Sequence, residues 1–140
     1  MVHTCSLYNV HKRERKIVQE YAIFVLKSFP NYGYEFHLIN ATGYTFLKKV
    51  VDTGLNYEIN LEYGYIRWID LDQDCMIVEV NFNGKRDAAL SLKYNMLEVM
   101  YELREHKRLD EVASPEEIAY IKKIDVDASP EKEEKVGKVV

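Results

Sequence analysis

The chain has 140 residues, of which 47% are hydrophobic and 30% are charged, and its formal net charge is −4. This length and balance suit one folded domain and exclude a wholly disordered chain. No stretch approaches the roughly 18 uncharged apolar residues that cross a bilayer, so we expect no membrane association.

Cysteine usage and the first residues indicate a compartment. Cys5 and Cys75 are too few for a disulfide framework and too far apart for a local metal knuckle. The first eight residues lack a basic segment followed by a long apolar one, which a secretory signal would need. We therefore expect a cytoplasmic protein with free thiols.

The charges are unevenly distributed along the chain. Between residues 52 and 81, seven acidic residues stand against one base, Arg67, whereas residues 11–29 hold five bases and two acids. An acidic region of this density steers a basic partner and disfavours contact with a nucleic-acid backbone. The sequence therefore predicts a protein partner with a basic surface and makes nucleic acid an unfavoured partner.

The first predicted element is a helix over residues 11–29. Apolar residues recur there at helical spacing, and Pro30 ends the pattern because its ring cannot continue a helix. The start of this segment is basic, with Lys12, Arg13, Arg15 and Lys16 close together. A solvated first turn is the simplest interpretation of these bases, and contact with a small anion or phosphate is the alternative.

Residues 34–82 follow the alternating pattern of β-strands. We expect strands at 34–39, 44–51, 56–63, 65–71 and 76–82, with polar turns at 40–43 and 72–74. Residues 44–51 would also suit a short helix capped by Gly54, and we favour the strand. The alternation in the last two strands places one set of side chains inward (Ile66, Trp68, Met76, Val78, Val80) and another outward (Tyr65, Arg67, Ile69, Glu79, Asn81).

The C-terminal part predicts helices and a tail. Asp87 is a candidate cap for a helix that runs to about Lys107, and Ser114 with Glu117 forms a capping box for a shorter one. We expect an α+β domain over residues 1–108, in which an N-terminal and a C-terminal helix pack on one face of an antiparallel meander of four or five strands. Residues 109–128 would form a docked helix and linker, and residues 129–140 a disordered tail.

Metal and cofactor sites find little support in the sequence. Residues 70–74 have the alternating acids of a calcium loop, but Cys75 and Asn81 stand where such a loop needs glycine and glutamate. The histidines and cysteines lack the close spacing of zinc ligands, and no glycine-rich phosphate loop is present (His3, Cys5, His11, His37, Cys75, His106). We therefore expect no bound metal and no cofactor.

One enzyme family offers a comparison. The expected order of helix, strands and helix resembles the core of the restriction-endonuclease-like nucleases, with Asp52 and the run Glu79-Val80-Asn81 as the nearest match to their motif. That resemblance would imply a divalent-metal-dependent nuclease that uses Asp52 and Glu79. Asn81 stands where the family has its catalytic lysine, and asparagine cannot carry that charge.

The outward sheet residues favour a different function. Tyrosine and arginine anchor protein interfaces, and acidic groups orient them, so we expect a non-catalytic module that occludes a basic site on a partner protein. Inhibitors, immunity proteins and phage or plasmid accessory proteins include modules of this size. The predicted contact residues are Glu58, Glu62, Tyr65, Arg67 and Glu79. Nucleic-acid binding through the bases at 12–16 and through Lys85 and Arg86 is the second alternative, and a homodimer is a further possible assembly.

Overall fold

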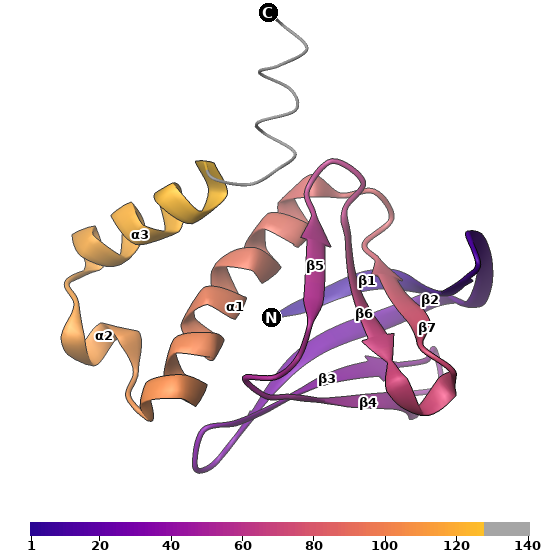
Figure 1. The fold of residues 1–140 in the computed structure, drawn as a ribbon, viewed down its shortest axis with the longest axis horizontal. Helices are drawn as coiled ribbons and strands as arrows, with labels where there is room; N and C mark the ends of the chain where they lie inside the picture. Colours follow the sequence, from indigo (N-terminus) through magenta and orange to yellow (C-terminus); the bar gives the residue numbers. More distant parts are fainter. Residues whose placement is uncertain (128–140) are drawn as a thin grey trace, which may run out of the picture.

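The computed structural model describes residues 1–127 and contains a seven-stranded antiparallel sheet with three helices (Figure 1). The strand order is β4-β3-β2-β1-β7-β6-β5. The strands are β1 (Val2–His11), β2 (Glu14–Phe29), β3 (Gly33–Ile39), β4 (Thr45–Val51), β5 (Tyr57–Asn60), β6 (Tyr65–Asp70) and β7 (Met76–Asn81). The helices are α1 (Arg86–Glu105), α2 (Leu109–Val112) and α3 (Pro115–Asp127), and a short 3-10 turn, η1 (Leu71–Gln73), precedes β7.

The α+β class is confirmed, but the predicted N-terminal helix is wrong. Most of residues 11–29 form β2, which pairs with β1 on one side and with β3 on the other. The sheet therefore has seven strands instead of four or five, and all the helices follow it in the chain. The order of helix, strands and helix, on which the resemblance to the nucleases depended, is absent.

Two irregularities in β2 explain the misleading helical spacing. Cys5 of β1 pairs with Ala22 of β2, but Leu7 pairs with Gln19, so the register shifts once between them. Tyr8 pairs with Ile17, so the register shifts a second time directly after Leu7. Each such bulge adds a residue to β2 and breaks the alternation of inward and outward side chains. The apolar residues of β2 consequently recur at intervals of three and four, although the backbone is extended.

The turn between β1 and β2 is a tight hairpin. Its two central residues, Lys12 and Arg13, have positive φ angles of 50° and 69°, as a type I′ turn requires. The sequence gives no sign of this turn, because asparagine and glycine are the residues that favour it. The bases that suggested a helix start thus lie at a hairpin tip and at the beginning of β2.

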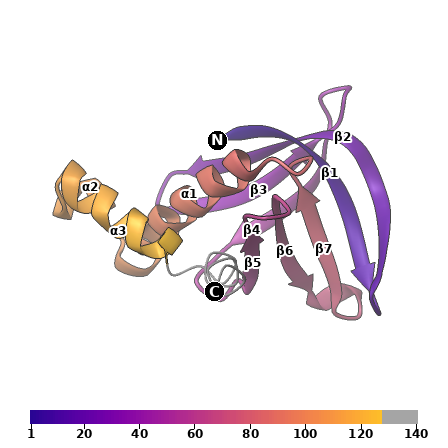
Figure 2. The same ribbon diagram turned by 90° about the horizontal axis from the view of Figure 1, so that it is seen from above.

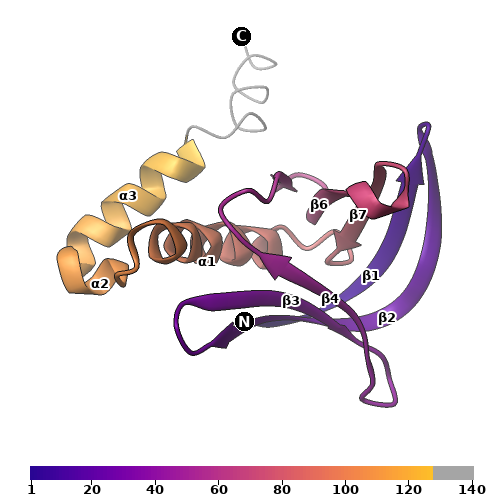
Figure 3. The ribbon, with the colours of Figure 1, turned by 60° about the horizontal axis from the view of Figure 1, so that its bottom comes forward.

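The sheet curves around α1, which packs against its inner face (Figures 2 and 3). The buried core joins inner-face side chains from β1, β2, β3, β6 and β7 to one face of α1; its largest members include Phe24, Phe36, Phe82, Trp68, Leu92 and Met96. Ile66, Trp68, Val78 and Val80 all belong to this core, as the alternation in their strands predicted. We call the opposite side of the sheet, which faces away from α1, the outer face.

Several local predictions are confirmed. Residues 45–51 are strand and not helix. In the turn before β7, the Asp70 carboxylate accepts a hydrogen bond from the backbone N–H of Asp72 at 3.1 Å. At the start of α3, the backbone N–H of Glu117 donates to the Ser114 hydroxyl and that of Ser114 donates to the Glu117 carboxylate, which together form the predicted capping box.

The C-terminal helices differ in part from expectation. Helix α1 begins at Arg86 with Lys85 as its N-cap residue, so Asp87 lies within the first turn and does not cap it. Helix α3 packs against α1, where Lys122 forms an ion pair with Glu98. The tail predicted at residues 129–140 lies outside the described residues. Within residues 1–127, no helix has the length and apolar character that crossing a membrane would require.

Candidate functional site

A row of side chains crosses the outer face of the sheet. Antiparallel pairing places Glu58 of β5 opposite Arg67 of β6, and Arg67 opposite Glu79 of β7. Glu79 is in turn opposite Tyr8 of β1, which is paired with Ile17 of β2. Directly opposed residues share one face and bring their side chains into contact. The five residues therefore form one continuous strip across five strands.

Glu79 is the centre of this strip and is completely buried, with 0% exposure. Arg15 donates to its carboxylate through Nε, at 3.0 Å, and through Nη2, at 2.6 Å. Arg67 donates to the other oxygen, Oε1, through Nε at 3.0 Å and Nη2 at 2.7 Å. We call Arg15, Glu79 and Arg67 the arginine–glutamate cluster.

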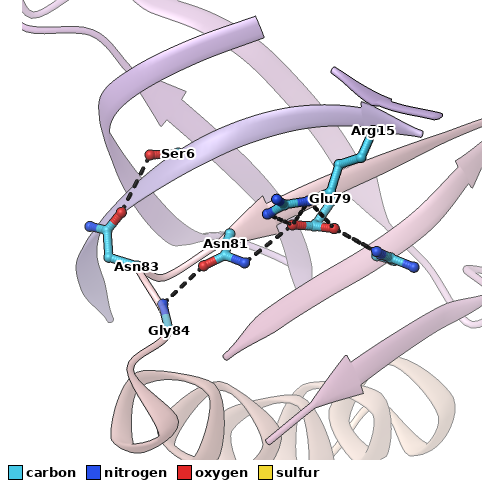
Figure 4. Close-up of polar contacts among 7 residues, drawn as sticks. Ser6, Arg15, Glu79, Asn81, Asn83 and Gly84 are labelled. Carbon is cyan, nitrogen blue, oxygen red and sulfur yellow. Dashed lines mark hydrogen bonds and ion pairs between the residues drawn. The ribbon is translucent and has the colours of Figure 1, made fainter. Parts of the chain in front are cut away.

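Asn81 connects the arginine–glutamate cluster to the beginning of α1 (Figure 4). Its amide Nδ2 donates to Oε2 of Glu79 at 3.2 Å, and its Oδ1 accepts from the backbone N–H of Gly84 at 3.0 Å. Gly84 lies in the loop that leads into α1. The position of Glu79 is thus fixed from three directions, by β2, by β6 and by this loop.

Two tyrosines support the guanidinium groups. The Arg15 guanidinium lies 3.5 Å from the centre of the Tyr8 ring, and the Arg67 guanidinium lies 4.3 Å from the centre of the Tyr65 ring. Cations are attracted to aromatic ring faces at these distances, and planar guanidinium groups stack on them. Tyr65 is itself buried, and this burial raises the pKa of its phenol. The arginine side chains are therefore held in place by contacts within the protein itself.

The arginines decide the charge state of Glu79. Burial on its own would raise the pKa of the Glu79 carboxyl, but hydrogen bonds from Arg15, Arg67 and Asn81 outweigh burial and hold that pKa below its usual value. Glu79 is consequently ionised at neutral pH. Two positive charges and one negative charge leave the cluster with a net charge of +1.

The cluster is reachable from solvent through its arginines only. The side chain of Arg15 is 41% exposed and that of Arg67 is 27% exposed, whereas Glu79 is covered. Exposed carboxylates border this positive centre on β5 and in the turns at the two ends of β6. We call these residues the acidic rim: Glu58, Glu62, Asp72 and Asp74.

Exposed apolar side chains lie on the same face. Ile17 of β2 is 47% exposed and Ile69 of β6 is 41% exposed. A pocket of about 230 Å³ opens beside Arg67, and its walls include Trp68, Ile69 and Ile77. The outer face thus combines a preorganised positive centre, apolar surface and an acidic border.

The structure brings together four of the five predicted contact residues. Glu58, Tyr65, Arg67 and Glu79 lie on neighbouring strands of the outer face. Glu62 lies beyond the end of β5, in the turn to β6. Glu79 is buried under the arginines, so it holds the site together and does not itself reach the surface.

Arg15 is the residue of the candidate site that the sequence did not indicate. The helix predicted over residues 11–29 placed it at a helix start and not in a strand of the sheet. In the structure β2 brings it beside β7, although 64 residues separate it from Glu79. A buried glutamate needs a compensating charge, and Glu79 in an otherwise apolar strand was the one signal that a second base had to lie nearby.

The residues of the proposed nuclease site have other contacts. Asp52 follows β4, and its carboxylate accepts a hydrogen bond from the backbone N–H of Gly54 at 3.0 Å. Both oxygens of Glu79 accept hydrogen bonds from arginine, which would compete with a divalent metal for the same lone pairs. Within the part of the chain that the structure describes, no group of three or more His, Cys, Asp or Glu side chains could hold a metal ion.

Comparison with known proteins leaves the site to be interpreted from its own geometry. No protein-family model matches the chain, and no curated protein matches it.

Proposed function

We propose that this chain is a non-catalytic protein-binding module that covers a site on a partner protein with its outer face. The observation that carries the proposal is the arginine–glutamate cluster, in which a fully buried carboxylate holds two half-exposed arginines on an open sheet face. Arginine is among the residues that contribute most to protein interfaces.

Preorganisation supports a binding role for these arginines. A free arginine loses rotamer entropy when a partner fixes it, at a cost of about 0.5–1.5 kcal/mol for one side chain. Here Glu79 and the tyrosine rings have already fixed both guanidinium groups. The outer face can therefore present them to a partner at a lower entropic cost.

The acidic rim supports a partner whose surrounding surface is basic. Glu58, Glu62, Asp72 and Asp74 are exposed and border the cluster on two sides. Complementary charges of this kind accelerate encounter and fix orientation more than they add affinity. The exposed side chains of Ile17 and Ile69 would supply apolar contact on the same face.

A pair of double variants tests this proposal. The tagged full-length chain captures partners from nuclease-treated lysate of its source cells, and mass spectrometry quantifies them. The double variant Ile17→Glu with Ile69→Glu puts charge on the outer face at side chains that are 47% and 41% exposed. The control, Tyr120→Glu with Ile121→Glu, makes the same type of change on α3, where the side chains are 66% and 39% exposed.

The proposal predicts one stoichiometric protein that the wild type and the α3 variant retain and the outer-face variant loses. Its capture should weaken as salt rises, because the acidic rim contributes to the encounter. Equal capture by both variants, or loss in the α3 variant alone, would contradict the proposal. Circular dichroism and thermal melting establish that both variants remain folded.

A further inference from the structure

The arginine–glutamate cluster retains hydrogen-bond donors that Glu79 does not use. Each arginine directs Nε and Nη2 at the carboxylate, which leaves its second terminal nitrogen, Nη1, free of that contact. Arg15 also makes a side-chain hydrogen bond with Tyr8. Glu79 also neutralises only one of the two positive charges. The exposed parts of Arg15 and Arg67 therefore form a fixed site in which the charges of the arginine–glutamate cluster sum to +1, with the Glu58 carboxylate directly opposite Arg67.

A surplus of this size matches a carboxylate better than a phosphate. One carboxylate brings a single negative charge, and arginine binds it with paired N–H donors. A phosphate monoester brings between 1.5 and 2 negative charges at about neutral pH. Glu58, which is directly opposite Arg67 in the sheet and also lines the pocket beside it, repels either anion, and it repels the more highly charged phosphate more strongly.

The pocket beside Arg67 indicates what lies next to that carboxylate. Its volume of about 230 Å³ is below the range of roughly 300–1,000 Å³ that holds drug-sized ligands, so it suits a single side chain. Its apolar walls are formed by Tyr57, Trp68, Ile69 and Ile77, and its polar side is formed by Asn56, Glu58 and Arg67. Anchor side chains at protein interfaces fill pockets of this type.

We propose that the arginine–glutamate cluster binds an aspartate or glutamate side chain of the partner protein, and that the pocket beside Arg67 takes a large apolar side chain adjacent to it. This inference rests on the proposed function and specifies the chemistry of the partner at that site. The partner thus presents one carboxylate to the centre of the outer face and basic groups to the acidic rim.

A titration with small probes tests the inference on the full-length chain. The probes are the blocked dipeptide N-acetyl-Phe-Glu-amide, its glutamine counterpart N-acetyl-Phe-Gln-amide, and inorganic phosphate. Nuclear magnetic resonance of the ¹⁵N-labelled protein follows the Nε–H signals of Arg15 and Arg67. We expect saturating shifts of both signals with the glutamate probe and about tenfold weaker binding of the glutamine probe, because a charge-assisted pair is lost.

Variants assign the effect to the cluster. Arg67→Lys and Arg15→Lys keep the charge but remove the planar fork, and each should weaken the glutamate probe about tenfold. Arg13→Lys at the hairpin tip is the control and should leave its binding unchanged. Because two independent cluster variants are used, a folding defect in one does not leave the inference without a test.

The alternative outcomes are distinct. Unsaturable shifts, equal binding of the glutamate and glutamine probes, or tighter binding of phosphate would each overturn the carboxylate assignment. If the outer-face variant loses the captured partner while the glutamate probe fails to bind, only the carboxylate inference is wrong. If the probe binds but that variant keeps the partner, the proposed function is wrong and the anion site remains.

Discussion

Replacing Glu79 by glutamine should destabilise the protein substantially. The substitution preserves the size of a side chain that is 0% exposed but removes the negative charge between two guanidinium groups. Breaking a fully buried ion pair costs about 3–5 kcal/mol, because the remaining charge stays uncompensated. Arg15 and Arg67 are 41% and 27% exposed, so water screens part of their repulsion. We therefore expect a loss of about 2–4 kcal/mol in the free energy of unfolding.

Urea denaturation of the wild type and the variant measures this loss directly. At about 3 °C per kcal/mol for a domain of this size, the melting temperature should fall by about 6–12 °C. Glu14→Gln is the matched control, since Glu14 is 75% exposed and lies 3.9 Å from the ammonium group of Lys16. An exposed pair of this kind contributes about 0–1 kcal/mol. A loss below about 1 kcal/mol for Glu79→Gln would refute the reasoning that Glu79 is needed to hold the two arginines together.

Three further predictions concern titration, thiol access and backbone geometry. The pKa of Glu79 in the folded state lies below its ordinary value of 4.5. Its contribution to stability is therefore complete above pH 4.5 and is lost as the pH falls through the folded-state pKa. The free energy of unfolding should thus decline more steeply on acidification in the wild type than in Glu79→Gln. Burial raises the pKa of the Cys5 thiol to about 12, whereas Cys75 is exposed. Iodoacetamide at about pH 8 should therefore label Cys75 alone in the folded protein and both thiols in urea, which mass spectrometry measures. Gly64→Ala should lower the free energy of unfolding by more than about 2 kcal/mol in denaturant titrations, because at a φ of 69° the new Cβ would lie 2.8 Å from the loop backbone before α1. Gly43→Ala, at a φ of 85° in open space, should lower it by about 1 kcal/mol. Equal losses for the two variants would contradict the tight contact at Gly64.

The part of the fold that local patterns control was predictable from the sequence. Strands β3 to β7 have the composition of strands, and the alternation in β6 and β7 assigned Ile66 and Trp68 to the core and Tyr65 and Arg67 to the outer face. The capping box at Ser114 fixed the start of α3 for the same reason, since its hydrogen bonds join residues three apart. Local signals of this kind do not depend on the rest of the chain.

The N-terminal hairpin could not be predicted because its determinants are not local. The bulges in β2 arise from pairing with β1 and change the spacing of the apolar residues to a helical one. Tyr21, at the first bulge, adopts a φ of 54°, which its residue type does not favour. Tertiary pairing with β1 and β3 thus outweighs the local preference of the segment.

The candidate site was predicted in part for the same reason. Arg67 and Glu79 are neighbours on successive strands, so alternation alone placed them together. Arg15 depends on the position of β2, and without it Arg67 was the one base expected among the outward carboxylates. The hydrogen bonds from Arg15 give the buried Glu79 a second arginine, and the exposed carboxylates lie at the rim.

The association rate of the purified partner tests the central claim most directly. In the double variant Glu58→Lys with Glu62→Lys, charges at the acidic rim are reversed, while Glu105→Lys with Glu116→Lys makes the same change in charge on the helices. If the outer face binds a partner with a basic surround, the rim variant should associate about tenfold more slowly at low salt and show a flatter dependence on ionic strength, and the helix variant should match the wild type. Unchanged association of the rim variant at every salt concentration would contradict the account.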